Sequence, residues 1–157
     1  MKVSVIIPCF NEVNTVETLL NNVIKEKSCD KEIIVIDDFS TDGTRKILQN
    51  LNGTKYTKLI LNDTNRGKGY CIQKGIEKST GDIILIQDAD LEYSPTDYKI
   101  LTDPIKNGYA DVVFGSRFIG SQQKRVLFFW HTVGNKFLTI LSNMFTNLNL
   151  TDMECCY

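Results

Sequence analysis

Short apolar runs rich in β-branched residues recur along the chain and alternate with longer segments of mixed polarity. Runs of this length and composition, bounded by polar or glycine-containing clusters, predict β-strands. The first run follows Met1 and Lys2 and lacks the flanks of a signal peptide, so we interpret it as a strand. The five predicted strands are Val3 to Ile7, Ile33 to Ile36, Lys58 to Leu61, Ile83 to Ile86 and Val112 to Phe114.

The segments between these runs carry apolar residues at helical spacing. Thr44 to Leu51 and Gly67 to Lys78 each place apolar side chains on one face, and Thr15 to Lys27 does so over its whole length. The strands themselves are almost continuously apolar, which is typical of a sheet covered by helices on both faces. We therefore expect a single α/β domain with a mainly parallel central sheet and right-handed crossovers.

A polar cluster follows each predicted strand. In an open parallel sheet the ligand binds at the carboxyl ends of the strands, so these clusters are the candidate binding residues. Five polar clusters at the same edge of the sheet are difficult to explain as solvated loops alone. The clusters are Cys9 to Glu12, Asp37 to Ser40, Asn62 to Lys68, Gln87 to Asp90 and Gly115 to Arg117.

Asp88-Ala-Asp90 is the most informative cluster. Two carboxylates two residues apart at a strand end can turn toward one point and hold Mg²⁺ or Mn²⁺, which prefer oxygen ligands and bridge phosphate oxygens. Glu92 can supply a third oxygen. The same tripeptide also occurs in ordinary surface turns, so the motif alone does not establish a metal site.

Asp37 and Asp38 follow the second buried strand and can accept hydrogen bonds from a base N–H or from ribose hydroxyls. Thr41 or Asp42 can cap the next helix, but capping does not explain two adjacent acids whose like charges repel. A phospho-acceptor aspartate of a receiver domain is a rival interpretation. The later clusters do not favour it, because a receiver domain does not need them.

Asn65-Arg66-Gly67-Lys68-Gly69 resembles a phosphate-binding loop but lacks the Walker A spacing. The glycines allow close backbone approach at a helix N-terminus, where Arg66 or Lys68 can lie along a diphosphate. The alternative is a basic loop that faces solvent at the start of a helix.

Composition narrows the class of protein. The chain has 157 residues, 42% of them hydrophobic, and its 18 basic and 19 acidic residues give a net charge of -1. We therefore expect one sizeable core and no general electrostatic field that recruits nucleic acid.

The five cysteines include no Cys-x-x-Cys pair, which argues against a disulfide framework or a structural zinc site and favours a reducing, cytoplasmic setting. No apolar stretch approaches the roughly 20 residues that span a bilayer.

Taken in order, these motifs resemble the inverting glycosyltransferase family 2, whose members have the GT-A fold. The branch that the chain most resembles is that of dolichyl-phosphate mannose synthase and the bacterial polyprenyl-phosphate glycosyltransferases. The resemblance covers essentially the whole chain. It rests on Pro8-Cys-Phe-Asn11-Glu12, Asp37-Asp38-x-Ser40-x-Asp42-Gly43-Thr44, Asn65-x-Gly67-Lys68-Gly69, Asp88-Ala-Asp90-Leu-Glu92, Gly115-Ser116-Arg117 and Thr151-Asp152-Met153-Glu154.

The resemblance implies a role for each matched residue. Pro8, Asn11, Glu12 and Asp38 would bind the base and ribose of a nucleotide-sugar donor, with Asp37 as a weaker assignment. It also implies that Asp88 and Asp90 bind the donor diphosphate through a divalent cation, with Glu92 beside them. Many relatives have glutamine where this chain has Glu92, which leaves the coordination open. Arg117 would grip the phosphate of a lipid acceptor.

The implied reaction is displacement of the nucleoside diphosphate by an acceptor oxygen, with inversion at the anomeric carbon. A polyprenyl phosphate is already anionic near neutral pH, so its transfer needs no general base. A sugar hydroxyl would need one, and Asp152 or Glu154 would be the first candidates, although both can instead cap a helix after Thr151.

Residues 1–120 would form the nucleotide-sugar-binding core and residues 121–157 a helical acceptor-side segment. Members of this branch continue beyond the position of Tyr157, so we expect a shortened version, and a non-catalytic nucleotide-binding module is the alternative function. An apolar stripe between Leu127 and Leu148 can lie on the cytoplasmic face of a membrane, pack on the sheet, or support a homo-oligomer.

Overall fold

The computed structural model describes residues 1–51, 53–116, 129–153 and 155. The chain divides into two compact units, Met1–Asp111 and Val112–Tyr157. The boundary that we predict at residue 120 lies outside the described residues and stays a prediction. Each unit is described by itself.

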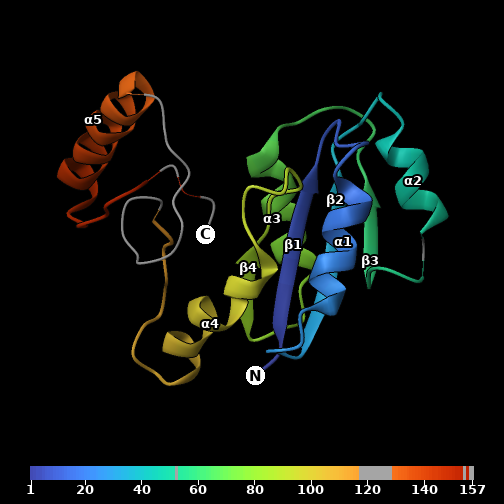
Figure 1. Ribbon diagram of the computed structural model, residues 1–157, viewed down its shortest axis with the longest axis horizontal. Helices are drawn as coiled ribbons and strands as arrows, with labels where there is room; N and C mark the ends of the chain where they lie inside the picture. The colour runs from blue at the N-terminus through green and yellow to red at the C-terminus, as the bar shows by residue number, and fades with distance from the viewer. Residues whose placement is uncertain (52, 117–128, 154, 156–157) are drawn as a thin grey trace. The chain divides into compact units, whose positions relative to one another are not determined.

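The first unit is built on a four-stranded parallel sheet in the order β3-β2-β1-β4 (Figure 1). The strands are β1 (Val3–Cys9), β2 (Lys31–Asp37), β3 (Lys58–Leu61) and β4 (Ile83–Ile86). β1 is central and pairs with β2 on one side and β4 on the other. The predicted parallel α/β sheet is therefore confirmed.

The helices of this unit are α1 (Val16–Lys25), α2 (Thr44–Asn50), α3 (Lys68–Lys78) and α4 (Tyr98–Lys106), with a short 3₁₀ helix, η1 (Pro95–Asp97), before α4. The chain runs from β1 to β2 to β3 in one direction across the sheet and then returns to β4 beside β1. Because parallel crossovers are right-handed, this reversal places α1 and α2 on one face and α3 on the other, as Figure 1 shows. The sheet is thus covered on both faces.

The core explains why these segments form these elements. Ile6, Ile34 and Ile36 are fully buried against Cys71 of α3. Gly75 brings α3 close to the sheet, because a Cβ there would lie only 2.5 Å from Ile6 Cγ2. The face of α1 predicted from periodicity is also the buried one, at Val16, Leu19, Leu20 and Val23.

The fifth predicted strand is wrong. Val112 to Phe114 is described but lies in irregular structure, and Val112 and Phe114 are 65% and 54% exposed. The propensity of β-branched and aromatic residues for strands reflects packing on a half-buried pleated surface. Such packing does not occur here.

The second unit contains α5 (Phe129–Thr146), and the described residues after it form no helix or strand. Three polar side chains of α5, those of Asn135, Thr139 and Asn143, form hydrogen bonds with this segment. Asn135 and Thr139 are both buried, and Asn143 both donates to and accepts from the backbone of Leu150, at 2.8 and 2.9 Å. No helix among the described residues is long and apolar enough to cross a membrane.

Candidate functional site

A cavity of about 230 Å³ opens at the carboxyl ends of β1 and β4. Strand order reverses between these two strands, and such a switch point is where open α/β sheets bind ligands. The cavity draws on residues from β1 and the loop after it, the end of β2, α3 and the loop after β4. It is lined by Pro8, Cys9, Phe10, Glu12, Asp38, Lys68, Cys71, Asp88, Ala89 and Asp90.

The structure therefore brings six of the sequence-predicted site residues to one cavity: Pro8, Glu12, Asp38, Lys68, Asp88 and Asp90. Asn11, Asp37 and Glu92 do not line it. Arg117 lies outside the described residues, as does Glu154. Asp152 belongs to the second unit.

Asp38 fastens two loops of the site together. Its carboxylate accepts hydrogen bonds from the backbone amides of Arg66, at 3.0 Å, and Gly67, at 2.7 Å, and from Asn62 Nδ2 at 2.8 Å. Burial opposes its negative charge, but these donors outweigh burial and hold the pKa of Asp38 below its ordinary value. The cavity wall at the end of β2 is therefore an ionised carboxylate fixed against the start of α3.

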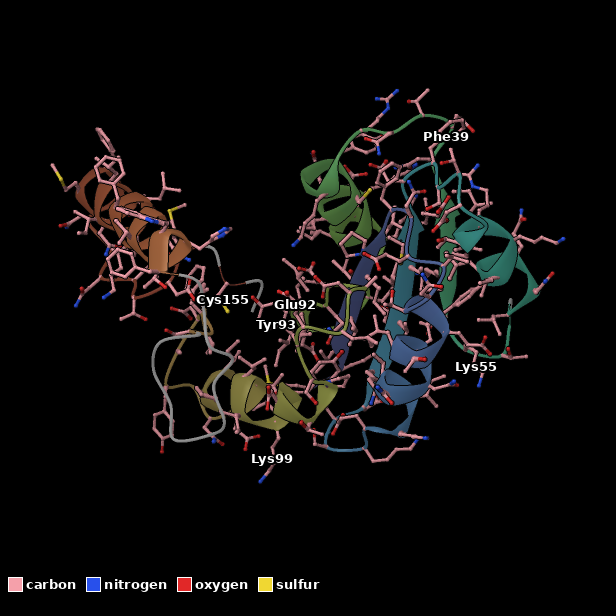
Figure 2. All side chains as sticks on the ribbon, turned by 45° about the horizontal axis from the view of Figure 1, so that its top comes forward. Phe39, Lys55, Glu92, Tyr93, Lys99 and Cys155 are labelled. Atoms are coloured by element: carbon pink, nitrogen blue, oxygen red, sulfur yellow. The ribbon has the colours of Figure 1, made fainter. Side chains whose placement is uncertain are left out.

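Asp37 has a different environment from its neighbour. Its side chain is fully buried, and Oδ2 accepts a hydrogen bond from Arg45 Nε at 2.6 Å. Arg45 also donates to the Asn62 carbonyl at 2.5 Å and lies over the Phe39 ring, 5.4 Å from its centroid. Figure 2 labels Phe39 on this loop. Asp37 thus anchors the loop between β2 and α2, and its predicted contact with a nucleoside stays a prediction.

The loop after β1 is held by the loop after β2. Asn11 Oδ1 accepts from the Thr41 amide at 2.9 Å, and the Glu12 amide donates to Thr44 Oγ1 at 2.8 Å. Asp42 accepts from the amides of Val13, at 3.0 Å, and Thr44, at 2.9 Å. Asp42 therefore ties the start of α2 to the preceding loop, and Gly43 takes the N-cap position.

Asp88 and Asp90 follow β4 and are positioned by different contacts. Asp88 pairs with Lys68, whose Nζ lies 2.6 Å from Oδ1 and 2.8 Å from Oδ2. Asp90 Oδ1 accepts from the Glu92 amide at 2.9 Å, which closes a tight turn. Glu92 is labelled in Figure 2 on the loop between β4 and α4, and its side chain is exposed.

These two carboxylates fit a divalent cation of the Mg²⁺ or Mn²⁺ type. No three His, Cys, Asp or Glu side chains among the described residues form a group that could hold a metal by themselves. Mg²⁺ commonly binds through one or two carboxylates, with water and substrate phosphates completing its shell. Asp88 and Asp90 both line the cavity and supply two carboxylates. A cation bound to them would therefore need phosphate oxygens from a ligand, together with water, to complete its shell.

Gln87 begins one of the predicted polar clusters, but the sequence assigns it no role of its own. It is fully buried, and its Nε2 donates to the carbonyls of Asp88, at 3.0 Å, and Tyr93, at 3.2 Å. Its Oε1 accepts from the Tyr98 hydroxyl at 2.9 Å. The amide holds the two ends of the acidic loop together. An amide immediately before Asp-Ala-Asp is the only sequence signal for this role.

Left-handed backbone also marks the site. Asn11, Phe39 and Leu91 have positive φ angles of 57°, 65° and 66°. Each lies next to a candidate site acid, namely Glu12, Asp38 and Asp90. This conformation costs a residue with a side chain about 1–2 kcal/mol, and such strain concentrates at binding sites. Periodicity and composition carry no signal for it at Phe39 and Leu91.

Two buried thiols line the cavity. Burial, together with nearby Asp38, raises the pKa of Cys71 to about 12. The pKa of Cys9 is also raised, first by burial and then by Asp37 and Glu12. Both thiols are therefore protonated near neutral pH, and neither is suited to act as a nucleophile.

Asp152 is buried in the second unit, with 1% of its surface exposed. Its Oδ1 accepts from Asn135 Nδ2 at 3.0 Å, and Thr139 donates to Asn135 Oδ1 at 3.1 Å. Asp152 thereby fastens the C-terminal segment to α5. Its role as a general base stays a prediction.

The chain is similar to known proteins over most of its length. The family model described as glycosyl transferase family 2 matches residues 4–156. Over 120 residues the chain is 35% identical to a dolichol-phosphate mannosyltransferase of Pyrococcus furiosus, covering 76% of this chain and 34% of that protein. It is 31% identical to an undecaprenyl-phosphate 4-deoxy-4-formamido-L-arabinose transferase of Proteus mirabilis, covering 98% and 47%. The chain thus spans less than half the length of these relatives.

Solved structures give the same result for the fold. The chain is similar to the mannosyltransferase PcManGT of Pyrobaculum calidifontis, solved in complex with GDP-Man and Mn²⁺. The match has a TM-score of 0.57 and 29% identity, and covers 71% of this chain and 33% of that one. This similarity covers most of the chain, and together with the family match it leaves the receiver-domain interpretation without support.

Proposed function

The chain belongs to glycosyl transferase family 2, and we propose that it transfers a sugar from a nucleotide-diphosphate sugar to a polyprenyl phosphate with the help of a divalent cation. The observation that carries this proposal is the cavity at the switch point between β1 and β4. Asp38, which we assign to the nucleoside, lines the same cavity as Asp88 and Asp90, which we assign to the cation. The names of the relatives, both of which act on polyprenyl phosphates, support the acceptor.

The donor would occupy the cavity with its base and ribose near Pro8, Glu12 and Asp38 and its diphosphate near Lys68, Asp88 and Asp90. Asp38 is ionised and fixed by backbone donors, so it can accept a hydrogen bond from the base or ribose without moving. Asn11 and Asp37 would support this wall through the loops that they hold.

Asp88 and Asp90 would hold Mg²⁺ or Mn²⁺, which stabilises the negative charge of the leaving diphosphate when bound. The mannosyltransferase complex with Mn²⁺ supports this assignment. Lys68 adds a positive charge on the same cavity, and the start of α3 directs its helix dipole toward it. Glu92 is proposed as a neighbour that tunes this charge.

In the proposed reaction an oxygen of the acceptor phosphate forms a bond to the anomeric carbon from the face opposite the leaving group. The bond from that carbon to the diphosphate breaks, and its electron pair leaves with the nucleoside diphosphate. The configuration inverts. Because the acceptor oxygen is already anionic, no residue of this chain needs to remove a proton. Arg117 is proposed to hold the acceptor phosphate.

Asp90→Ala tests the donor site. We expect the variant to keep its fold and to lose Mn²⁺-dependent binding of UDP or GDP, because one of two cation-binding carboxylates is gone. Calorimetry with each nucleotide, with and without Mn²⁺, measures this, and circular dichroism checks the fold. Unchanged metal dependence would remove Asp90 from the site.

A transfer assay separates the enzyme from the alternative, a nucleotide-binding module without turnover. The chain is incubated with UDP- or GDP-linked sugars, Mn²⁺ and a polyprenyl phosphate. Formation of the glycosylated lipid supports the proposed function. Nucleotide binding without transfer supports the binding module.

A polyprenyl-phosphate acceptor also implies peripheral contact with the cytoplasmic face of a membrane. Large apolar side chains of α5 are exposed, among them Phe129, Trp130, Phe137, Ile140, Met144 and Phe145. We expect the chain to co-float with vesicles that contain polyprenyl phosphate and Phe145→Ser to weaken this binding. If neither protein floats, the surface does not bind these vesicles, and packing on the sheet or self-association is left as its use.

A further inference from the structure

Lys68 and Asp88 form a close ion pair across the cavity. Lys68 Nζ lies 2.6 Å from Oδ1 and 2.8 Å from Oδ2 of Asp88, so one ammonium contacts both carboxylate oxygens. The pair joins the first residue of α3 to the loop after β4. Both residues line the cavity together with Asp90. The ion pair therefore occupies the place where the proposed cation would bind.

A divalent cation and the Lys68 ammonium compete for the same carboxylate. A metal that reached Asp88 while Lys68 remained in place would add two positive charges beside a third, and like charges at this distance repel. The Asp88 side chain is 14% exposed, so solvent screens this repulsion only in part. Lys68 must withdraw before Asp88 can give its oxygens fully to the metal.

Lys68 is able to withdraw. Its side chain is 46% exposed, and a lysine ammonium is a hydrated point charge on a flexible four-carbon stem. A diphosphate in the cavity offers anionic oxygens to the same ammonium. The ligand can thus take Lys68 away from Asp88 and at the same time supply the phosphate oxygens that a two-carboxylate cation site needs.

We infer that Lys68 is a built-in counter-ion that blocks Asp88 against free metal ions and is drawn away by the diphosphate of the donor, so that the cation binds well only together with the nucleotide. This inference rests on the proposed function for the identity of the ligand. The competition between Lys68 and a metal at Asp88 can be tested without any nucleotide.

The first experiment measures binding of Mn²⁺ alone to the full chain by electron paramagnetic resonance. Lys68→Met removes the competing charge and keeps most of the apolar stem. We expect it to bind Mn²⁺ more tightly than the wild type, by a factor within the about 5- to 150-fold range of coupling between two sites. Lys78→Met is the matched control, because it removes the same charge from the other end of α3. Its affinity should equal that of the wild type.

A second variant locates the effect. Adding Asp88→Asn to Lys68→Met should abolish the gain in Mn²⁺ affinity, because the carboxylate that Lys68 blocked is gone. A gain that survives in the double variant would overturn the inference, as would a Lys68→Met variant that binds Mn²⁺ no more tightly than the wild type. Circular dichroism of each variant confirms that the comparison is between folded proteins.

The nucleotide arm tests the release of Lys68. UDP or GDP should strengthen Mn²⁺ binding to the wild type more than to Lys68→Met, because only in the wild type does the nucleotide also draw a competing ammonium away from Asp88. Equal strengthening in both proteins would overturn the release. If no variant binds either nucleotide but Lys68→Met still binds Mn²⁺ more tightly, the competition at Asp88 is supported and the proposed function fails. If the wild type transfers sugar but Lys68→Met binds Mn²⁺ no more tightly than the wild type, the proposed function is supported and the competition at Asp88 is overturned.

Discussion

Asp37 and Asp38 are adjacent in the sequence but differ in their partners. Asp38 accepts two backbone amides and the Asn62 amide at the cavity. Asp37 is buried against Arg45. A strand end turns successive side chains in opposite directions. Asp38 can therefore contribute to the binding site while Asp37 holds the loop between β2 and α2, and the two acids share no partner.

Removing Arg45 would leave the buried Asp37 carboxyl group without its cationic partner. We expect Arg45→Met to lower the free energy of unfolding by on the order of 3 kcal/mol, reduced somewhat by the partial exposure of Arg45. Urea denaturation measures the change. Lys46→Met is the control, because it removes an exposed charge from the next position of α2. Equal unfolding midpoints for the two variants would show that the ion pair does not stabilise the fold.

The acids of the candidate site could be recognised from the sequence, but their contacts could not. Asp38, Asp88 and Asp90 stand directly after predicted strands, which is why the sequence placed them at one edge of the sheet. The partner of Asp37 is eight positions away on α2, and Gln87 acts through Tyr98 on α4. Such contacts depend on how loops fold back, which periodicity does not encode.

At the scale of elements, α3 depends on its closest approach to the sheet. At Gly75 an added Cβ would meet Ile6 Cγ2 at 2.5 Å and Ile36 Cδ1 at 3.2 Å. These neighbours belong to central strands that are themselves closely packed. The close approach of the sheet, and not helix propensity, is therefore what restricts position 75 to glycine.

We expect Gly75→Ala to lower the free energy of unfolding by about 1–3 kcal/mol, because overpacking forces the sheet or the helix to shift. Gly69→Ala on the same helix is the matched comparison, since nothing lies within 4 Å of a Cβ there. It should be neutral or raise stability by up to about 1 kcal/mol through helix propensity. Thermal unfolding followed by circular dichroism compares them. A stabilised Gly75→Ala would contradict the packing seen at Ile6.

The helices that bury an apolar face could be predicted from the sequence. The fifth strand was predicted wrongly, because that segment has no buried face. The observed α1, α2 and α3 lie within one or two residues of the limits expected from apolar spacing. Val112 to Phe114 has the composition of a strand, but its side chains are not packed on a sheet. Three residues carry too little periodicity to show whether they will be covered.

At the scale of the molecule, a second polar cluster closes the end of the sheet opposite the site. The buried carboxylate of Glu32 accepts from Ser4 Oγ at 2.6 Å and from Thr80 through its amide, at 2.5 Å, and its hydroxyl, at 3.0 Å. Lys2 Nζ lies 3.4 Å away. Burial opposes the charge, but these donors prevail and lower the pKa of Glu32 to about 2. This cluster joins β1, β2 and the turn before β4.

The lowered pKa of Glu32 predicts sensitivity of the fold to acid. The ionised carboxylate stabilises the folded state fully above its ordinary pKa of 4.5, and this contribution is lost as the pH falls toward about 2. We expect Glu32→Gln to be less stable than the wild type by up to about 3 kcal/mol at pH 7 and the difference to shrink by pH 3. Urea denaturation at several pH values measures it, with the exposed Glu77→Gln as control. A difference independent of pH would point to lost packing rather than lost charge.

The central position of β1 affects how the chain can fold as the ribosome synthesises it. β1 is made first and can pair with β2 early, but its other edge pairs with β4, so that Val3 waits for Ile83. At the usual rate of about 5–20 residues per second, several seconds pass before β4 emerges. During that interval an apolar strand keeps an open edge, which is a template for aggregation. A chaperone that shields this edge should therefore raise the yield of folded protein, and slower translation, which lengthens the interval, should lower it.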